Sequence, residues 1–188
     1  MYVPPHFAEQ RLDVLRQLIH DYPLGMLVTL GEEGLNANHI PFEFDSIPAP
    51  LGTLRGHVAR ANPVWRDFSQ TVDTLVVFLG PQSYITPSWY STKSESGEVV
   101  PTYNYLAVHA YGSLQIRHEA EWLRGLVTRL THRFESQRAT PLPRSFVECF
   151  AVTRIQLRHG ERCAWRRFCT EALRIGQRIL QSPLQSFP

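Results

Sequence analysis

Polar side chains able to hold a charged aromatic ligand gather in four short stretches of this 188-residue chain. Each stretch mixes an amide, an imidazole or a hydroxyl with proline and aromatic neighbours: "NANHIPF", "RGHVARANP", "SYITPSWY" and "VPTYNYLAVHAYG". A phosphorylated aromatic molecule requires such a mixture. Its phosphate needs arginine, hydroxyl and backbone N–H donors, and its flat ring needs aromatic or aliphatic walls. The four stretches together indicate a site for a ligand of that kind.

A structural explanation of the same residues stays open, because polar side chains also satisfy backbone groups at strand ends and tight turns. Their spacing alone does not identify a ligand. The chain contains no G-x-G-x-x-G, G-x-x-x-x-G-K-[ST], H-E-x-x-H, G-x-S-x-G or C-x-x-C pattern, and its eight histidines are scattered. We therefore expect no metal site and assign no catalytic residue, while enzymatic activity is left open.

Residues 100–112 illustrate how a strand would present these groups. Side chains alternate between the two faces of a strand. Thr102 and Asn104 then share one face with the aliphatic residues that follow, and Tyr103 and Tyr105 share the other face with His109 and Tyr111. The second face is mostly aromatic rings, so this strand is expected to line a ligand or an interface.

The elements that position the four stretches follow from hydrophobic periodicity and from turn residues. The pattern predicts helices over residues 8–22 and 118–135, and a short helix opened by Asn62-Pro63. Extended segments are predicted at 24–30, 35–44, 53–59, 73–80, 82–90 and 100–117. The absence of regular strand–helix alternation favours a mainly β, α+β fold: an antiparallel barrel or sheet with flanking helices.

Composition changes abruptly near residue 138. Residues 1–137 carry 10 Lys and Arg against 14 Asp and Glu, whereas residues 138–188 carry 9 Arg against 3 Glu and hold Cys149, Cys163 and Cys169. Three cysteines do not suggest a disulfide framework. No apolar run approaches the roughly 20 residues that span a bilayer, and no signal-peptide pattern opens the chain. We therefore expect a cytoplasmic protein without a membrane segment.

Five motifs, in order, resemble the PaiB-type family, which is described as FMN-binding, negative transcriptional regulators of bacteria. They are "MYVPPHF", "LNANHIPFEFD", "LGTLRGHVARANPVWRDF", "LVVFLGPQSYITPSWY" and "VVPTYNYLAVHAYG". The resemblance implies an antiparallel FMN-binding split β-barrel over residues 1–137, and a homodimer with FMN at the subunit seam. Residues 138–188 depart from the family as a divergent, basic C-terminal segment, with only 152–155 left of a closing strand and a helix expected at about 168–181.

Carried over by motif, eleven residues are implied to bind the cofactor: Asn38, His39, His57, Arg60, Asn62, Ser88, Trp89, Tyr90, Thr102, Asn104 and Tyr105. Arg60 and the helix start at Asn62 are the best phosphate donors among them. Each also has a simpler explanation. Asn62 can be only a helix cap, Trp89 only a core or interface anchor, and Arg60 can pair with a carboxylate of a partner subunit.

Three functions are compatible with these residues. The first is an FMN-binding regulator that represses transcription, as the resemblance implies. Residues 1–137 are net acidic and carry no helix-turn-helix pattern, so regulation is expected to be indirect unless the basic tail contacts DNA. The alternatives are an FMN-dependent oxidoreductase of the split-barrel type, in which the cofactor carries the chemistry, and a relative that has lost flavin binding.

Overall fold

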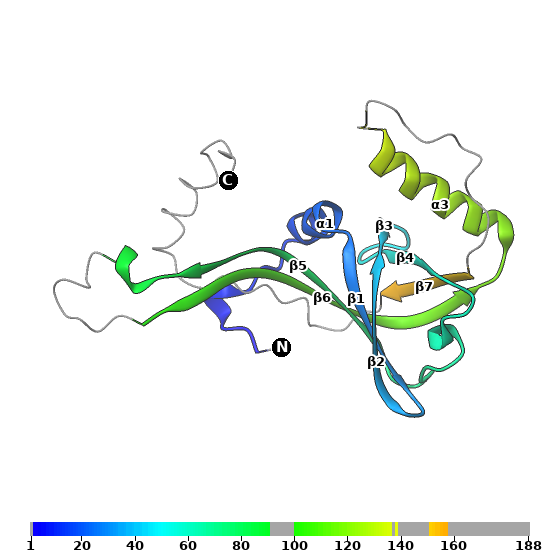
Figure 1. Cartoon of the computed structure of the whole chain (residues 1–188), viewed down its shortest axis with the longest axis horizontal. Coiled ribbons are helices and arrows are strands. Elements are labelled where there is room, and N and C mark those ends of the chain that lie inside the picture. Colours follow the sequence, from blue (N-terminus) through cyan, green and yellow to red (C-terminus); the bar gives the residue numbers. More distant parts are fainter. Residues whose placement is uncertain (1, 91–99, 137, 139–150, 158–188) are drawn as a thin grey trace.

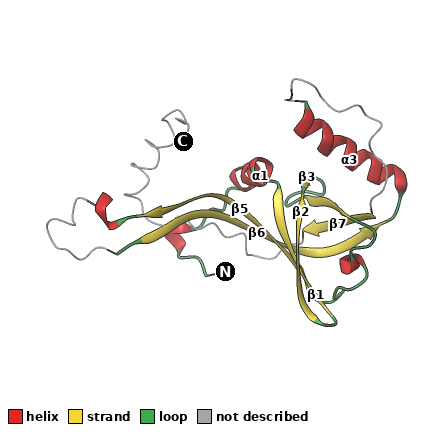
Figure 2. Cartoon of the chain, viewed as in Figure 1, coloured by secondary structure: helices red, strands yellow, loops and turns green. Residues whose placement is uncertain are grey.

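A computed structural model of the chain describes residues 2–90, 100–136, 138 and 151–157 (Figure 1). In these residues seven strands form one antiparallel sheet in the order β2-β1-β5-β6-β7-β4-β3, flanked by helices (Figure 2). The strands are β1 (Leu24–Gly31), β2 (Gly34–Pro41), β3 (Glu43–Asp45), β4 (Thr53–Val58), β5 (Thr74–Ile85), β6 (Thr102–Arg117) and β7 (Ala151–Leu157). The helices are α1 (Leu12–Asp21) and α3 (Ala120–Glu135), with single 3₁₀ turns η1 (Pro5–Phe7), η2 (Pro63–Trp65) and η3 (Pro87–Trp89).

Both predicted α-helices are present, and the first begins four residues later than expected. The Glu9 carboxylate accepts hydrogen bonds from the backbone N–H groups of Gln10 and Arg11, each at 3.0 Å, and so holds this segment outside the helix. The predicted runs 73–80 and 82–90 belong largely to one strand. A register shift between Leu79 and Gln82 bends β5 without ending it.

Phe42 closes the barrel between two strands that are not neighbours in the sheet. Its ring is completely buried. A methyl group at Gly25 of β1 would lie 2.9 Å from Phe42 Cδ2, and one at Gly56 of β4 would lie 2.9 Å from Phe42 Cε1. Real side chains do not approach so closely, so glycine at both positions lets the ring fill the space between β1 and β4.

Beyond the barrel, β5 and β6 continue together as a two-stranded arm, which we define as residues 82–90 and 100–105 (Figure 1). Tyr84 lies opposite Tyr103, and Ser83 lies opposite Asn104. β6 begins at Thr102, so the strand on which the alternation was predicted is confirmed for residues 102–111.

Both helices contact β3, and Arg133 of α3 donates a hydrogen bond to the carbonyl of His20 in α1. Leu15, Leu18 and Ile19 form the buried face of α1, and Leu18 lies against β5 at Gly80. A bidentate ion pair from Arg129 to Glu43 links α3 to β3. In the described part of the chain, no helix combines the length and the hydrophobicity that a membrane crossing requires.

β7 comes from the segment after residue 137 and lies between β6 and β4. It contains the four residues, 152–155, in which the sequence retains the family's pattern. The helix predicted at about 168–181 and the three cysteines lie outside the described residues.

Candidate functional site

The eleven predicted binding residues fall into two groups in the structure. One group lies on β2, on β4 and in the loop that leads to η2, beside the line where β2 and β4 approach each other. We call it the seam group: Asn38, His39, His57, Arg60 and Asn62. The other lies on the arm and is called the arm group: Ser88, Trp89, Tyr90, Thr102, Asn104 and Tyr105.

Two members of the seam group contact each other directly. Asn62 Nδ2 donates a hydrogen bond of 2.7 Å to Asn38 Oδ1, and Asn38 Nδ2 donates one of 2.9 Å to Asn36 Oδ1. Asn36, Asn38 and the buried Ile40 alternate with exposed residues, so they share the inner face of β2. The contact joins β2 to the segment after β4, which are not hydrogen-bonded neighbours in the sheet.

Each histidine of the seam group lies on the face of its strand that is turned away from the buried residues. His39 alternates with Asn38 and is exposed, whereas His57 alternates with the buried Gly56 and Val58 of β4. The prediction named Asn38 and His39 together, but the pleat separates their side chains. Arg60 is exposed in the loop after β4, and its guanidinium has no hydrogen bond or ion pair with any residue that the structure describes.

Asn62 is the cap residue that the sequence predicted. Its Oδ1 accepts a hydrogen bond of 3.0 Å from the backbone N–H of Val64, with Pro63 in the first position of η2. The helix, however, is a single 3₁₀ turn of three residues. One turn aligns too few peptide units for its dipole to attract a phosphate strongly. The structure therefore does not provide the helix dipole that was expected to favour a phosphate at this point.

The arm group combines aromatic surface with one polar atom that lacks a partner. Trp89, in the turn η3, is 43% exposed, and Asn104 Oδ1 is buried without a hydrogen-bond partner among the described residues. Tyr84 and Tyr103 are 53% and 51% exposed on the same face of the arm. The predicted list omitted these two tyrosines, although the alternation in residues 100–112 already places Tyr103 on an aromatic face.

β6 separates His57 of the seam group from the arm group. Val152 of β7 pairs with Arg117 of β6 on one side and with His57 of β4 on the other, so His57 lies level with the end of β6. Asn104 is thirteen residues earlier on the same strand, or about 43 Å along it at ~3.3 Å per residue. Figure 1 accordingly shows the arm extending away from the part of the barrel where β4 and β7 pair.

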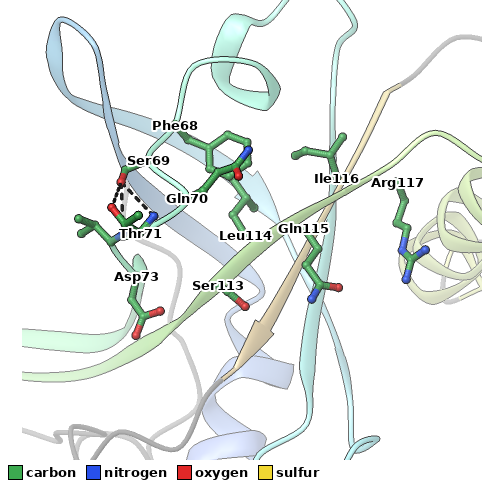
Figure 3. A pocket seen from close by; sticks show the side chains of 11 residues that line it. Phe68, Ser69, Gln70, Thr71, Asp73, Ser113, Leu114, Gln115, Ile116 and Arg117 are labelled. Carbon is green, nitrogen blue, oxygen red and sulfur yellow. Dashed lines mark hydrogen bonds between the residues drawn. The ribbon is translucent and has the colours of Figure 1, made fainter.

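A separate pocket of about 610 Å³ opens between the loop before β5 and the last residues of β6 (Figure 3). It is lined by residues 68–73 and 113–117, and none of the eleven predicted residues belongs to it. Ser69 Oγ accepts hydrogen bonds from the backbone N–H groups of Thr71 and Val72, at 3.3 and 3.2 Å. Ser69 and Thr71 of the lining thus stabilise the loop itself.

Two histidines on the barrel strands have depressed pKa values. Burial disfavours the charged imidazolium, and desolvation lowers the pKa of His57 below its ordinary value of 6.5. Desolvation likewise lowers the pKa of His109, with a smaller contribution from the positive charge of the N-terminus. Both rings are therefore neutral near pH 7. Each can donate a hydrogen bond from one ring nitrogen and accept one at the other.

Comparison with known proteins places this arrangement in a family. A family model described as "Putative FMN-binding domain" matches residues 1–159. The chain is 33% identical over 142 residues to "Protease synthase and sporulation protein PAI 2" of Bacillus subtilis, a match covering 76% of this chain and 65% of that protein, less than two thirds of its length. It is 31% identical over 157 residues to "Uncharacterized protein YKL070W" of Saccharomyces cerevisiae, a match covering 73% of this chain and 92% of that protein. Similar sequences therefore extend beyond bacteria.

Solved structures resemble the fold at low sequence identity. The conserved hypothetical protein Rv2991 of Mycobacterium tuberculosis superposes with a TM-score of 0.59 at 11% identity, covering 100% of this chain and 98% of that one. The "FAD and Heme binding protein" of Mycobacterium smegmatis superposes with a TM-score of 0.53 at 17% identity, covering 89% of this chain and 78% of that one. These likenesses concern the fold, and they confirm the predicted antiparallel split β-barrel.

Proposed function

Because this chain belongs to the family described as "Putative FMN-binding domain", we propose that it is an FMN-binding regulatory protein that acts as a homodimer. In this proposal each flavin lies between the seam group of one subunit and the arm group of the other. The protein represses transcription through a partner or ligand rather than by docking residues 1–137 on DNA, because that part is net acidic.

The observation that carries the proposal is the separation of His57 from Asn104 along β6. One subunit cannot bring His57 and Asn104 to the same small ligand when thirteen residues of continuous strand lie between them. A two-fold axis solves this problem, since it places the arm of each subunit against the barrel of the other in two equivalent contacts. The exposed Tyr84 and Tyr103 supply apolar surface for such a contact.

The residues present fit the chemistry of FMN. Arg60 offers an exposed guanidinium without a partner among the described residues, as a phosphate requires. The buried Asn104 Oδ1 has no donor among them, and an N–H group on the edge of a flavin ring would satisfy it. A bound flavin would supply electron- or hydride-transfer chemistry, while the protein residues hold its phosphate, enclose its ring and exclude water.

A visible absorbance spectrum of the protein, loaded with FMN and then desalted, tests cofactor binding. Retained flavin absorbance supports the proposal, and a protein that cannot be loaded contradicts it. Steady NAD(P)H consumption by the loaded protein would instead favour the oxidoreductase alternative.

Complementation tests the shared site. We expect Arg60→Ala and Asn104→Ala each to weaken FMN binding enough that the cofactor is lost on desalting, although weak binding remains measurable by titration. When the two variants are co-expressed, half of the dimers are mixed and each mixed dimer has one intact site, which restores about a quarter of the wild-type sites. Arg60→Ala co-expressed with the double variant Arg60→Ala/Asn104→Ala is the matched control, because every subunit then lacks Arg60 and no site is restored. Equal results for the two pairs would exclude a site shared between subunits.

A further inference from the structure

The geometry points to Asn36 and Asn38 as positioning residues that set the direction of Arg60, rather than as ligands of the cofactor. This inference rests on the proposed function, in which Arg60 binds the phosphate of FMN. It concerns a chain of side-chain amides that runs from β2 across the seam to the loop after β4.

The direction of every hydrogen bond in this chain is fixed by one backbone group. The N–H of Val64 can only donate, so Asn62 must turn its Oδ1 toward it, at 3.0 Å. Asn62 Nδ2 is then the donor to Asn38 Oδ1 at 2.7 Å, and Asn38 Nδ2 is the donor to Asn36 Oδ1 at 2.9 Å. Reversing any one amide would set two like groups against each other, so the three side chains have a single mutually satisfied arrangement.

The amide chain replaces a backbone ladder at this point. β2 and β4 stand at non-adjacent places in the sheet order, and among the residues that the structure describes no strand pairing holds the loop after β4 against β2. The contact between Asn38 and Asn62 provides a direct polar link there. Asn38 commits half of its hydrogen-bonding capacity, one lone pair of its oxygen and one N–H, to this row of amides.

The other end of the loop is also anchored to the β1–β2 hairpin. Asp67 Oδ1 accepts a hydrogen bond of 2.8 Å from the backbone N–H of Glu32, and the N–H of Ser69 donates to the carbonyl of Leu30 at 2.7 Å. The carboxylate fits only because Gly31 has no side chain, since a methyl group there would lie 2.5 Å from Asp67 Oδ2. Both ends of the segment 62–69 are therefore held by the same hairpin.

Arg60 lies in the tight turn next to the first anchor. Asn62 N–H donates to the carbonyl of Ala59 at 2.9 Å, and Trp65 Nε1 donates to the carbonyl of Arg60 at 3.0 Å. The Arg60 backbone is thus fixed on both sides while its side chain is exposed. Loss of the amide chain releases Asn62 and, with it, the turn that directs Arg60.

The test compares FMN with riboflavin, which has the same ring system and lacks the phosphate. Asn38→Leu keeps the approximate volume and removes both polar groups. We expect it to raise the dissociation constant for FMN about tenfold, as loss of a buried hydrogen bond does, and to change that for riboflavin less than about twofold. Ala37→Ser, on the outer face of the same strand, is the matched control and is expected to change neither constant.

Two further measurements separate positioning from direct contact. In the protein without flavin, Asn38→Leu is expected to speed amide hydrogen exchange at Val64, Arg66 and Asp67, because the released loop opens more often. In the background of Arg60→Ala, the same substitution is expected to have little further effect on FMN binding. Should Asn38→Leu not fold, Asn36→Ala is used in its place in each measurement. This variant removes Asn36 Oδ1, the last acceptor in the row of three amides.

Different failures have different meanings. If the wild-type protein binds no FMN, the proposed function fails. Unchanged hydrogen exchange at Val64 in Asn38→Leu would overturn the anchoring role, whether or not FMN binds. If FMN and riboflavin weaken equally, or if FMN weakens with no change in exchange, Asn38 acts as a ligand or on the whole fold, and the inference is overturned.

Discussion

The guanidinium of Arg129 on α3 binds both oxygens of the Glu43 carboxylate on β3, through Nε at 2.6 Å and Nη2 at 2.8 Å. The pair holds the second helix against the edge of the sheet, and the hydrogen bonds to Glu43 raise the pKa of Arg129. The two parallel hydrogen bonds strengthen this ion pair. Solvent weakens it, because about half of the Arg129 side chain is exposed. We expect Arg129→Ala to lower the free energy of unfolding by about 1 kcal/mol. Urea denaturation with a double-mutant cycle against Glu43→Gln measures the coupling, and additive effects would show that the pair contributes nothing.

Glycine at position 56 is required by the ring of Phe42. Gly56→Ala places a methyl group 2.9 Å from Phe42 Cε1 and 3.1 Å from Ile40 Cγ2, so we expect a loss of about 1–3 kcal/mol in unfolding free energy. Phe42→Leu in the same chain should recover part of that loss. Gly125→Ala in α3 is the control, since its methyl group meets only the flexible end of Arg129 and alanine favours a helix. Equal thermal stability of Gly56→Ala and wild type would contradict the close packing.

The two exposed tyrosines of the arm provide a test of the proposed dimer. We expect Tyr84→Ser with Tyr103→Ser to weaken self-association at least about tenfold, because aromatic anchors dominate the energy of such contacts. The folded barrel should be retained, since both rings are about half exposed. Sedimentation equilibrium measures the change, and Tyr22→Ser at the end of α1 is the matched control for loss of an exposed tyrosine. An unchanged association constant would move the interface away from the arm.

Acid should destabilise the protein through His57 and His109. Both have pKa values lowered by burial, so the unfolded chain binds more protons than the folded chain once the pH falls below the ordinary value of 6.5. The contribution of the neutral rings is complete above that pH and is lost as the pH falls toward the depressed values. We expect thermal denaturation between pH 7 and pH 5 to show a falling midpoint, with a shallower slope for His109→Gln. An identical slope would exclude His109 as a cause.

Local patterns predicted the parts of the fold that depend on neighbouring residues. The spacing of Leu15 and Ile19 identified α1, and Asn62-Pro63 identified a capped turn because capping involves residues two positions apart. The link between Asn38 and Asn62 joins segments brought together only by the closed barrel, and no local rule anticipates it. The strand that carries the predicted alternation was identified correctly for residues 102–111. The family motifs still grouped Asn38 with His39, which the pleat places on opposite faces.

The position of β7 has a consequence for the order in which the chain is synthesised. β4 and β6 are completed by residue 117, yet the strand that joins them begins at Ala151. Until then the nascent chain exposes two unpaired strand edges, the kind of surface that recruits other chains. The pairing of Thr53 with Gln156 also makes the contact long-range and closure slow. A premature stop before residue 151 would therefore release an open sheet prone to aggregate, so shortened products of this gene should be found in insoluble material rather than as small folded domains.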